Sequence, residues 1–131
     1  MSFSKTVAFC SMALALSVVT AKAEGDAAAG EKVFKKCQSC HVVDSDKKKV
    51  GPTLQGVIGR TAGTVEGFKY SKVMVEVGEG GLVWNDETLA GYLADPKGYM
   101  KGNKMSFAGL KKEEDIANVI AYLKQFSPTA E

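Results

Sequence analysis

Two cysteines three positions apart, Cys37 and Cys40, stand directly before His41, the only histidine of the 131-residue chain. At this spacing two thiols can add to the vinyl groups of one haem from the same side of the ring. The histidine that follows is then placed to reach the iron through its Nε2 atom. We therefore predict one covalently bound haem c per chain, with Cys37 and Cys40 as the thioether attachments and His41 as a ligand to the iron.

Three other uses of a closely spaced cysteine pair are less well supported by the sequence. A disulfide between Cys37 and Cys40 would close a very small loop and would stabilise the fold little. A redox pair of the thioredoxin kind is expected next to a βαβ pattern, which the sequence lacks. A zinc site needs two further ligands, and beyond Cys10 in the N-terminal segment the chain offers no other cysteine or histidine.

The second axial position of such an iron can be filled by methionine, by lysine or by no residue. Three methionines follow His41, namely Met74, Met100 and Met105. A thioether is a soft ligand that favours ferrous iron and raises the reduction potential, which suits electron transfer. Met105 lies in the glycine-bounded stretch GNKMSFAG, where the backbone can approach a haem face. The residues alone favour Met105 and leave Met100 open.

Helices are the elements that the sequence predicts around these residues. Capping residues and apolar spacing predict helices over residues 26–37, 85–94 and 112–126, the last with its apolar residues at positions i, i+3, i+4 and i+7. A shorter helix near residues 71–77 is weaker, because its alternating valines would equally suit a strand. No alternation strong enough for a sheet is present, so we predict an all-α fold.

Between the predicted helices lie long glycine-rich loops, over residues 51–67, 78–81 and 98–109. Loops this long in a small domain usually have a functional reason. Few helices and much loop leave the domain without an obvious core of its own. We therefore expect the bound cofactor to fill its centre.

The N-terminal segment has the pattern of a secretory signal. Lys5 precedes an apolar run over residues 7–19, and Ala21 and Ala23 form a small-x-small cleavage site. We expect cleavage after Ala23, export to the bacterial periplasm, and one mature domain over residues 24–131. The alternative is an N-terminus that stays uncleaved and anchors the chain in the membrane.

Charge excludes one class of function. Removing residues 1–23 takes away Lys5 and Lys22 and no acid, so the formal net charge falls from +2 to zero. A strongly basic surface for nucleic acid is therefore not supported. We expect a monomer that binds no nucleic acid and whose electrostatic function depends on how its charges are distributed.

Over residues 25–127 the chain resembles the soluble class I cytochromes c of the mitochondrial and alphaproteobacterial type. The stretches that carry the resemblance are, in order, GDAAAGEKVFKKC, CQSCH, GPTLQGVIGR, GFKYS, WNDETLAGYLADPKGYMKGNKMSFAG and IAYLK. The resemblance implies three to four helices and long loops wrapped around the haem, with the N- and C-terminal helices crossing at Gly30, Phe34 and Tyr122.

The resemblance also implies roles for individual residues. His41 and Met105 would be the two axial ligands, and the Pro52 carbonyl would accept the Nδ1–H of His41 and fix its tautomer. Tyr92 would direct its hydroxyl at the methionine sulfur. Asn103 would lie beside the haem, where the family pattern has threonine. Residues at positions that surround the inner haem propionate are Arg60, Tyr70 and Trp84.

Lysines are gathered on both sides of the predicted site. We define the lysine rim as Lys35, Lys36, Lys97, Lys101, Lys104, Lys111 and Lys112. A basic rim on a neutral protein makes a dipole that steers docking onto acidic partners. By resemblance, the donor would be a quinol:cytochrome c oxidoreductase, and the acceptor a cytochrome c oxidase or a photosynthetic reaction centre.

No residue group in the sequence indicates substrate turnover, so we expect an electron-transfer protein rather than an enzyme. Two alternatives remain: a haem peroxidase or gas-binding cytochrome if the iron has an open position, and a membrane-tethered electron relay if the N-terminus is not cleaved.

Overall fold

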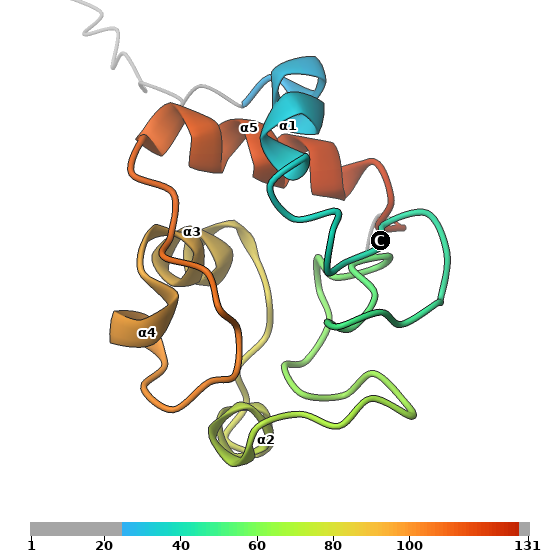
Figure 1. The fold of residues 1–131 in the computed structure, drawn as a ribbon, viewed down its shortest axis with the longest axis vertical. Helices are drawn as coiled ribbons and strands as arrows, with labels where there is room; N and C mark the ends of the chain where they lie inside the picture. Colours follow the sequence, from blue (N-terminus) through green and yellow to red (C-terminus); the bar gives the residue numbers. More distant parts are fainter. Residues whose placement is uncertain (1–24, 129–131) are drawn as a thin grey trace, which may run out of the picture.

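The structure, a computed structural model, describes residues 25–128 and consists of helices joined by long loops (Figure 1). The predicted signal segment and its cleavage site lie outside the described residues. Within residues 25–128 no strand is present, and the one β contact is an isolated bridge between Thr61 and Val83. The helices are α1 (Ala27–Phe34), α2 (Lys72–Glu79), α3 (Asp86–Ala94), α4 (Pro96–Tyr99) and α5 (Glu113–Lys124). The all-α prediction is confirmed.

The first and last helices, α1 and α5, cross each other at one end of the molecule (Figure 1). A Cβ atom on Gly30 would lie 1.9 Å from the carbonyl oxygen of Asn118, so only glycine allows this approach. The rings of Phe34 and Tyr122 pack beside the crossing with their centroids 5.3 Å apart. The chain leaves the C-terminal end of α1 next to this crossing and continues directly into the cysteine pair.

The segment with the alternating valines forms a helix, α2, rather than a strand. The hydroxyl of Ser71 accepts a hydrogen bond from the backbone N–H of Met74 at 3.2 Å and caps the helix. Val75 is exposed, whereas Val73 and Val77 pack against the core. Burial of one helical face together with this cap therefore favours the helix over a strand.

Helix α3 begins with a reciprocal capping box, in which the side chains of Asn85 and Thr88 each accept the other's backbone N–H at 2.9 Å. Pro96 ends α3, as the sequence predicts, but it also begins the short helix α4, which the sequence did not predict. Proline is favoured at the first helical position because its missing N–H has no partner there. The carboxylate of Asp95 caps α4 by accepting from the backbone N–H of Gly98.

The helices and loops surround a central hollow rather than a solid core. In Figure 1, α3 and α4 lie on one side and the loops of residues 37–70 on the other, with α1 and α5 above and α2 below. Buried apolar residues from these elements form a single cluster around it, with Trp84, Leu89 and Tyr92 among them. No helix over residues 25–128 is both long and apolar enough to cross a membrane.

Candidate functional site

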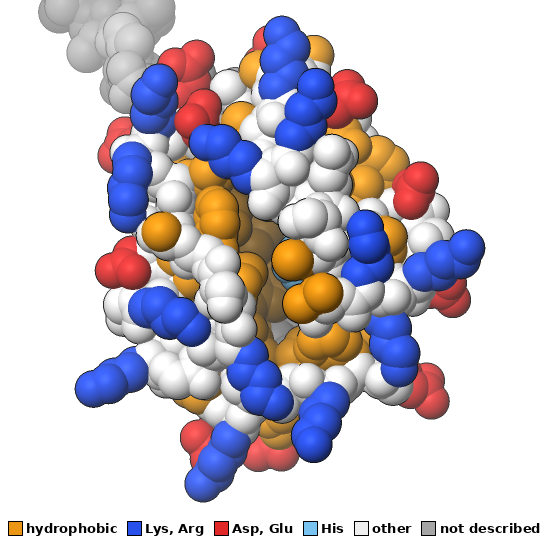
Figure 2. Space-filling view, in the orientation of Figure 1, with side chains coloured by type: hydrophobic (Ala, Val, Ile, Leu, Met, Phe, Trp, Pro, Cys, Tyr) orange, Lys and Arg blue, Asp and Glu red, His pale blue; other side chains and the backbone are white. Residues whose placement is uncertain are grey.

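A cavity of about 510 Å³ occupies the hollow between these elements. Figure 2 shows it as a cleft with hydrophobic walls that opens to one face of the molecule. Its volume lies within the ~300–1,000 Å³ of typical cofactor sites. Cys37, Cys40, His41 and Met105, which the sequence singles out, all line it.

The charges of the lining fit a haem. Apolar residues dominate the walls, and the lining contains no aspartate or glutamate. Its charged members are all basic: Lys36, Arg60, Lys69 and Lys104. A haem is an apolar ring with two carboxylates, and burying a carboxylate is costly unless positive charge and hydrogen bonds accompany it. The lining therefore suits the group that the Cys-x-x-Cys-His motif predicts.

The cysteine pair sits on a tight turn that continues from α1. The backbone N–H groups of Cys40 and His41 both donate to the carbonyl oxygen of Cys37, at 3.0 and 2.9 Å. This turn brings both thiols to the cavity, and they form no disulfide. Burial, reinforced by neighbouring Cys40, raises the pKa of the Cys37 thiol. Over residues 25–128, no cluster of histidine, cysteine and acidic residues could hold a separate metal ion, which leaves the zinc alternative without support.

The ring of His41 is held from two sides. Its Nδ1 atom lies 2.7 Å from the carbonyl oxygen of Pro52, which leaves Nε2 as the free ligand atom. A Cβ atom on Gly51 would lie 2.3 Å from Cε1 of the ring, so a side chain at position 51 would displace it. Burial lowers the pKa of His41, partly offset by the bond to Pro52, and this favours the neutral imidazole that can bind a metal.

The two candidate methionines have different surroundings. Met105 is half-buried and lines the cavity, with its sulfur 3.9 Å from the hydroxyl of Tyr92. Met100 is 3 % exposed, belongs to the hydrophobic core and does not line the cavity. Burial raises the pKa of Tyr92 to about 12, so its hydroxyl stays protonated and can donate to the sulfur. This geometry favours Met105 over Met100.

The residues that the resemblance places around the propionates also meet at the cavity. Arg60, Tyr70 and Trp84 all line it, and Met74 lies among them. Burial lowers the pKa of Arg60 and raises that of Tyr70. The Tyr70 hydroxyl accepts from the backbone N–H of Val65 at 3.0 Å, so its proton is free to be donated elsewhere.

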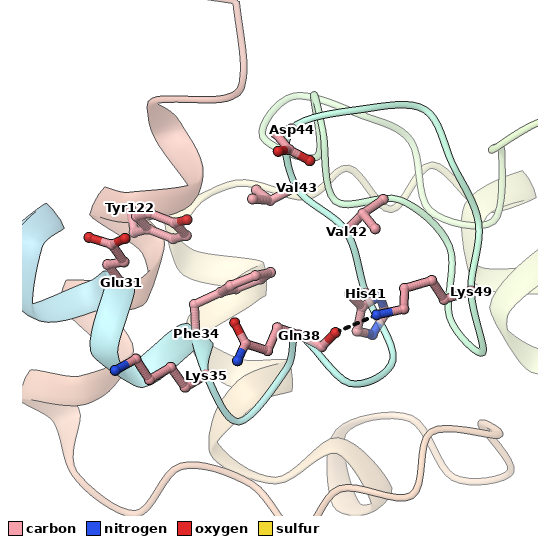
Figure 3. Close-up of a pocket in the computed structure, with 10 residues that line it drawn as sticks. All are labelled: Glu31, Phe34, Lys35, Gln38, His41, Val42, Val43, Asp44, Lys49 and Tyr122. Carbon is pink, nitrogen blue, oxygen red and sulfur yellow. Dashed lines mark hydrogen bonds between the residues drawn. The ribbon is translucent and has the colours of Figure 1, made fainter.

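A second, smaller recess of about 290 Å³ lies between α1, α5 and residues 42–49 (Figure 3). Its lining mixes apolar side chains such as Phe34 and Val43 with charges of both signs from Glu31 and Asp44 and from lysines. Figure 3 shows the ammonium of Lys49 bonded to the Gln38 carbonyl oxygen across it, at 2.8 Å. The recess lacks the uniform apolar, acid-free lining of the haem cavity.

Every residue of the lysine rim is exposed, and basic side chains ring the mouth of the cleft in Figure 2. Two of the rim lysines also bond to the backbone: the ammonium of Lys97 donates to the carbonyl oxygen of Asn103 at 2.5 Å, and that of Lys111 to Ala108 at 3.2 Å. Sequence reasoning missed Lys69 and Phe107, which also line the cavity. A signal was present in the sequence, since Lys69 directly precedes Tyr70 and Phe107 lies two residues after Met105.

Comparison with known proteins agrees with this site. The family model described as Cytochrome c matches residues 27–127. Cytochrome c2 of Afifella marina is 51 % identical over 100 residues, which cover 76 % of this chain and 81 % of that protein. Cytochrome c 2.1 of Caenorhabditis elegans is 54 % identical over 101 residues, covering 76 % of this chain and 88 % of that protein.

Solved structures show the same likeness. Cytochrome c2 of Rhodospirillum centenum has a TM-score of 0.76 at 45 % identity and covers 79 % of this chain and 100 % of its own. Cytochrome c2 of Rhodobacter sphaeroides has a TM-score of 0.74 at 42 % identity, covering 82 % of this chain and 100 % of its own.

A helical shell around an apolar, acid-free cavity with a Cys-x-x-Cys-His motif defines a c-type haem protein. This chain belongs to the cytochrome c family. Its cofactor is therefore a covalently attached haem c, and its general activity is that of an electron carrier of this family.

Proposed function

We propose that this chain is a one-electron shuttle of the bacterial periplasm, which carries electrons from a quinol:cytochrome c oxidoreductase to a terminal oxidase or a photosynthetic reaction centre. The observation that carries the proposal is that the imidazole of His41 and the thioether of Met105 line the same apolar cavity. Met74 is a second thioether on this cavity, but the Tyr92 hydroxyl lies near the sulfur of Met105, at 3.9 Å. A haem with both axial positions filled exchanges electrons but offers no open site for a substrate. The secretory pattern of residues 1–23 supports the periplasm as its compartment.

The residues around the haem have distinct roles in this proposal. Cys37 and Cys40 would hold the haem through two thioether bonds, and His41 and Met105 would bind its iron. The bond from His41 Nδ1 to Pro52 fixes the ring orientation and makes the imidazole a better donor. The hydroxyl of Tyr92 lies within reach of the Met105 sulfur and tunes its electron donation.

Carboxylates of the cofactor would meet the basic and hydroxyl-bearing part of the lining. Arg60, Tyr70 and Trp84 offer a guanidinium, a phenol and an indole N–H on the cavity wall. Together they compensate the cost of burying a propionate and hold the ring in one orientation. When bound, the haem would supply the reversible one-electron couple, and the apolar walls of the chain would keep water from the part of it that they cover.

The lysine rim surrounds the mouth of the haem cleft (Figure 2) and would attract an acidic partner to it. We expect the rate of electron transfer to a detergent-solubilised cytochrome c oxidase to fall as salt rises, because exposed charges are screened beyond ~8 Å near physiological ionic strength. The triple variant Lys101→Gln, Lys104→Gln, Lys112→Gln should react at least about tenfold more slowly at low salt, and its rate should depend less on salt. Stopped-flow oxidation across a salt series measures both quantities.

A second triple variant, Lys32→Gln, Lys72→Gln, Lys124→Gln, is the matched control. It removes the same number of charges from α1, α2 and α5, and none of these lysines lines the cavity. Lys97 and Lys111 are left out of the test variant because their ammonium groups also hold the backbone of Asn103 and of Ala108. Equal rates for the two triple variants would show that the rim is an ordinary solvated face.

A further inference from the structure

A buried carboxamide, that of Asn103, ties together the segment that carries Met105. The residue is only 4 % exposed. Its Nδ2 atom donates to the carbonyl oxygens of Pro96 and Met100, each at 2.8 Å. Its Oδ1 atom accepts from the backbone N–H of Met105 at 2.9 Å and lies 3.5 Å from the Tyr92 hydroxyl. Both donors of the carboxamide and one acceptor position of its oxygen are thereby used within the chain.

Little else holds the backbone at this place. Among the described residues, no backbone–backbone hydrogen bond involves residues 104–109, and the chain rejoins the rest of the fold when Leu110 donates to Leu93. The Asn103 carboxamide oxygen is therefore the bond that fixes the Met105 backbone N–H. Its two donors reach back to the start and the end of α4, which joins Met105 to a helix capped by Asp95.

We propose that Asn103 is the positioning residue for Met105, and that its carboxamide sets how readily the thioether is displaced from the iron by an external ligand. The inference rests on the proposed function, in which Met105 is an axial ligand. Asn103 also lines the cavity, as the sequence predicts, but its carboxamide bonds to the Met105 N–H and to two carbonyl oxygens at the ends of α4. It therefore acts through the Met105 backbone. A side chain that only filled space at position 103 would leave the displacement rate unchanged.

The test is the rate at which imidazole binds to the oxidised holoprotein, because imidazole must displace the axial methionine to enter. Asn103→Leu keeps the size of the side chain but removes all of its hydrogen bonds and leaves buried backbone groups unpaired. With net contributions of about 1 kcal/mol for each of three bonds, the binding rate should rise roughly a hundredfold. Stopped-flow absorbance measures it.

Asn103→Thr is the milder variant, which places here the residue type of the family pattern. A threonine hydroxyl can still accept from the N–H two residues on, but it cannot also reach two carbonyl oxygens. We expect a rate about tenfold above wild type. If Asn103→Leu does not fold, Asn103→Thr is the only test variant. An imidazole-binding rate equal to that of the wild type would then overturn the proposal.

Asn118→Leu is the matched control, because Asn118 is the other buried asparagine, 7 % exposed, and accepts from the backbone N–H of Asp26 at 2.8 Å near the crossing of α1 and α5. It should lower the melting temperature but leave the imidazole rate within about twofold of wild type. An equal rise in the rate for Asn118→Leu and Asn103→Leu would overturn the proposal.

Amide hydrogen exchange at the Met105 N–H, followed by NMR on the reduced holoprotein, is an independent readout. The Met105 N–H should be protected in the wild type and in Asn118→Leu but exposed in Asn103→Leu.

The variant Met105→Ala distinguishes failure of the proposed function from failure of the inference about Asn103. If it binds imidazole at the wild-type rate, Met105 is not the ligand and the proposed function fails. If it binds fast while the Asn103 variants remain slow, only the inference about Asn103 fails.

Discussion

Replacing Met105 with alanine should convert a protein that excludes carbon monoxide into one that binds it stoichiometrically in the reduced state. Met105 is a thioether that lines the haem cavity, and alanine offers no donor to replace it. Loss of a soft ligand that stabilises ferrous iron should also lower the reduction potential, and the open iron should gain peroxidase activity. Carbon monoxide titration and a potentiometric titration measure the first two effects.

Met100→Leu is the control for this experiment, because Met100 is the nearest methionine along the chain and is buried in the core. Leucine conserves its volume, so the cost to the free energy of unfolding should stay below about 1.5 kcal/mol. Ligation should not change, since the backbone carbonyl that Asn103 uses is retained. Carbon monoxide binding by Met100→Leu, with none by Met105→Ala, would show that the ligand assignment is wrong.

Removing both thioether attachments should leave the chain largely unfolded. In the variant Cys37→Ala, Cys40→Ala the cavity of about 510 Å³ would lose its bound group. The apolar walls that the haem covers would then face water, and roughly 25 cal/mol of stabilisation would be lost for each Å² of apolar area newly exposed. Typical domains are stable by only about 5–15 kcal/mol, so the chain has little stability to lose. Far-ultraviolet circular dichroism should show most of the helix signal lost.

A control with the same number of changes in the same turn is Gln38→Ala, Ser39→Ala. Both residues lie between the cysteines and are exposed, so their loss should leave haem attachment and helix content intact. A haem-free cysteine variant that unfolded cooperatively on heating, with native helix content, would mean that the polypeptide holds its own core.

The sequence predicted the helices whose signals are local. The apolar periodicity around Ile116 and Val119 identified α5, and Asn85 identified the start of α3. Helix α4 was missed because Pro96 indicates a helix end and a helix start equally well. For α2, the alternating valines fitted two structures, and burial against the rest of the fold decides between them.

Part of the candidate site could likewise be predicted from local sequence, and part could not. Cys37, Cys40 and His41 form a contiguous motif, so their meeting at the cavity could be predicted from spacing alone. The bonds of Asn103 to Pro96 and Met100, and that of Lys97 to Asn103, depend on how one short segment folds back on itself. Residue types do not encode such contacts, because an asparagine or a lysine in a loop is usually solvated.

Absorption spectroscopy of the purified, oxidised holoprotein tests the central claim most directly. If His41 and Met105 both bind the iron, the oxidised protein shows the weak long-wavelength band typical of sulfur bound to ferric iron, and the reduced protein's spectrum does not change under carbon monoxide. A spectrum without that band, or an immediate change when carbon monoxide is added to the reduced wild type, would contradict the account.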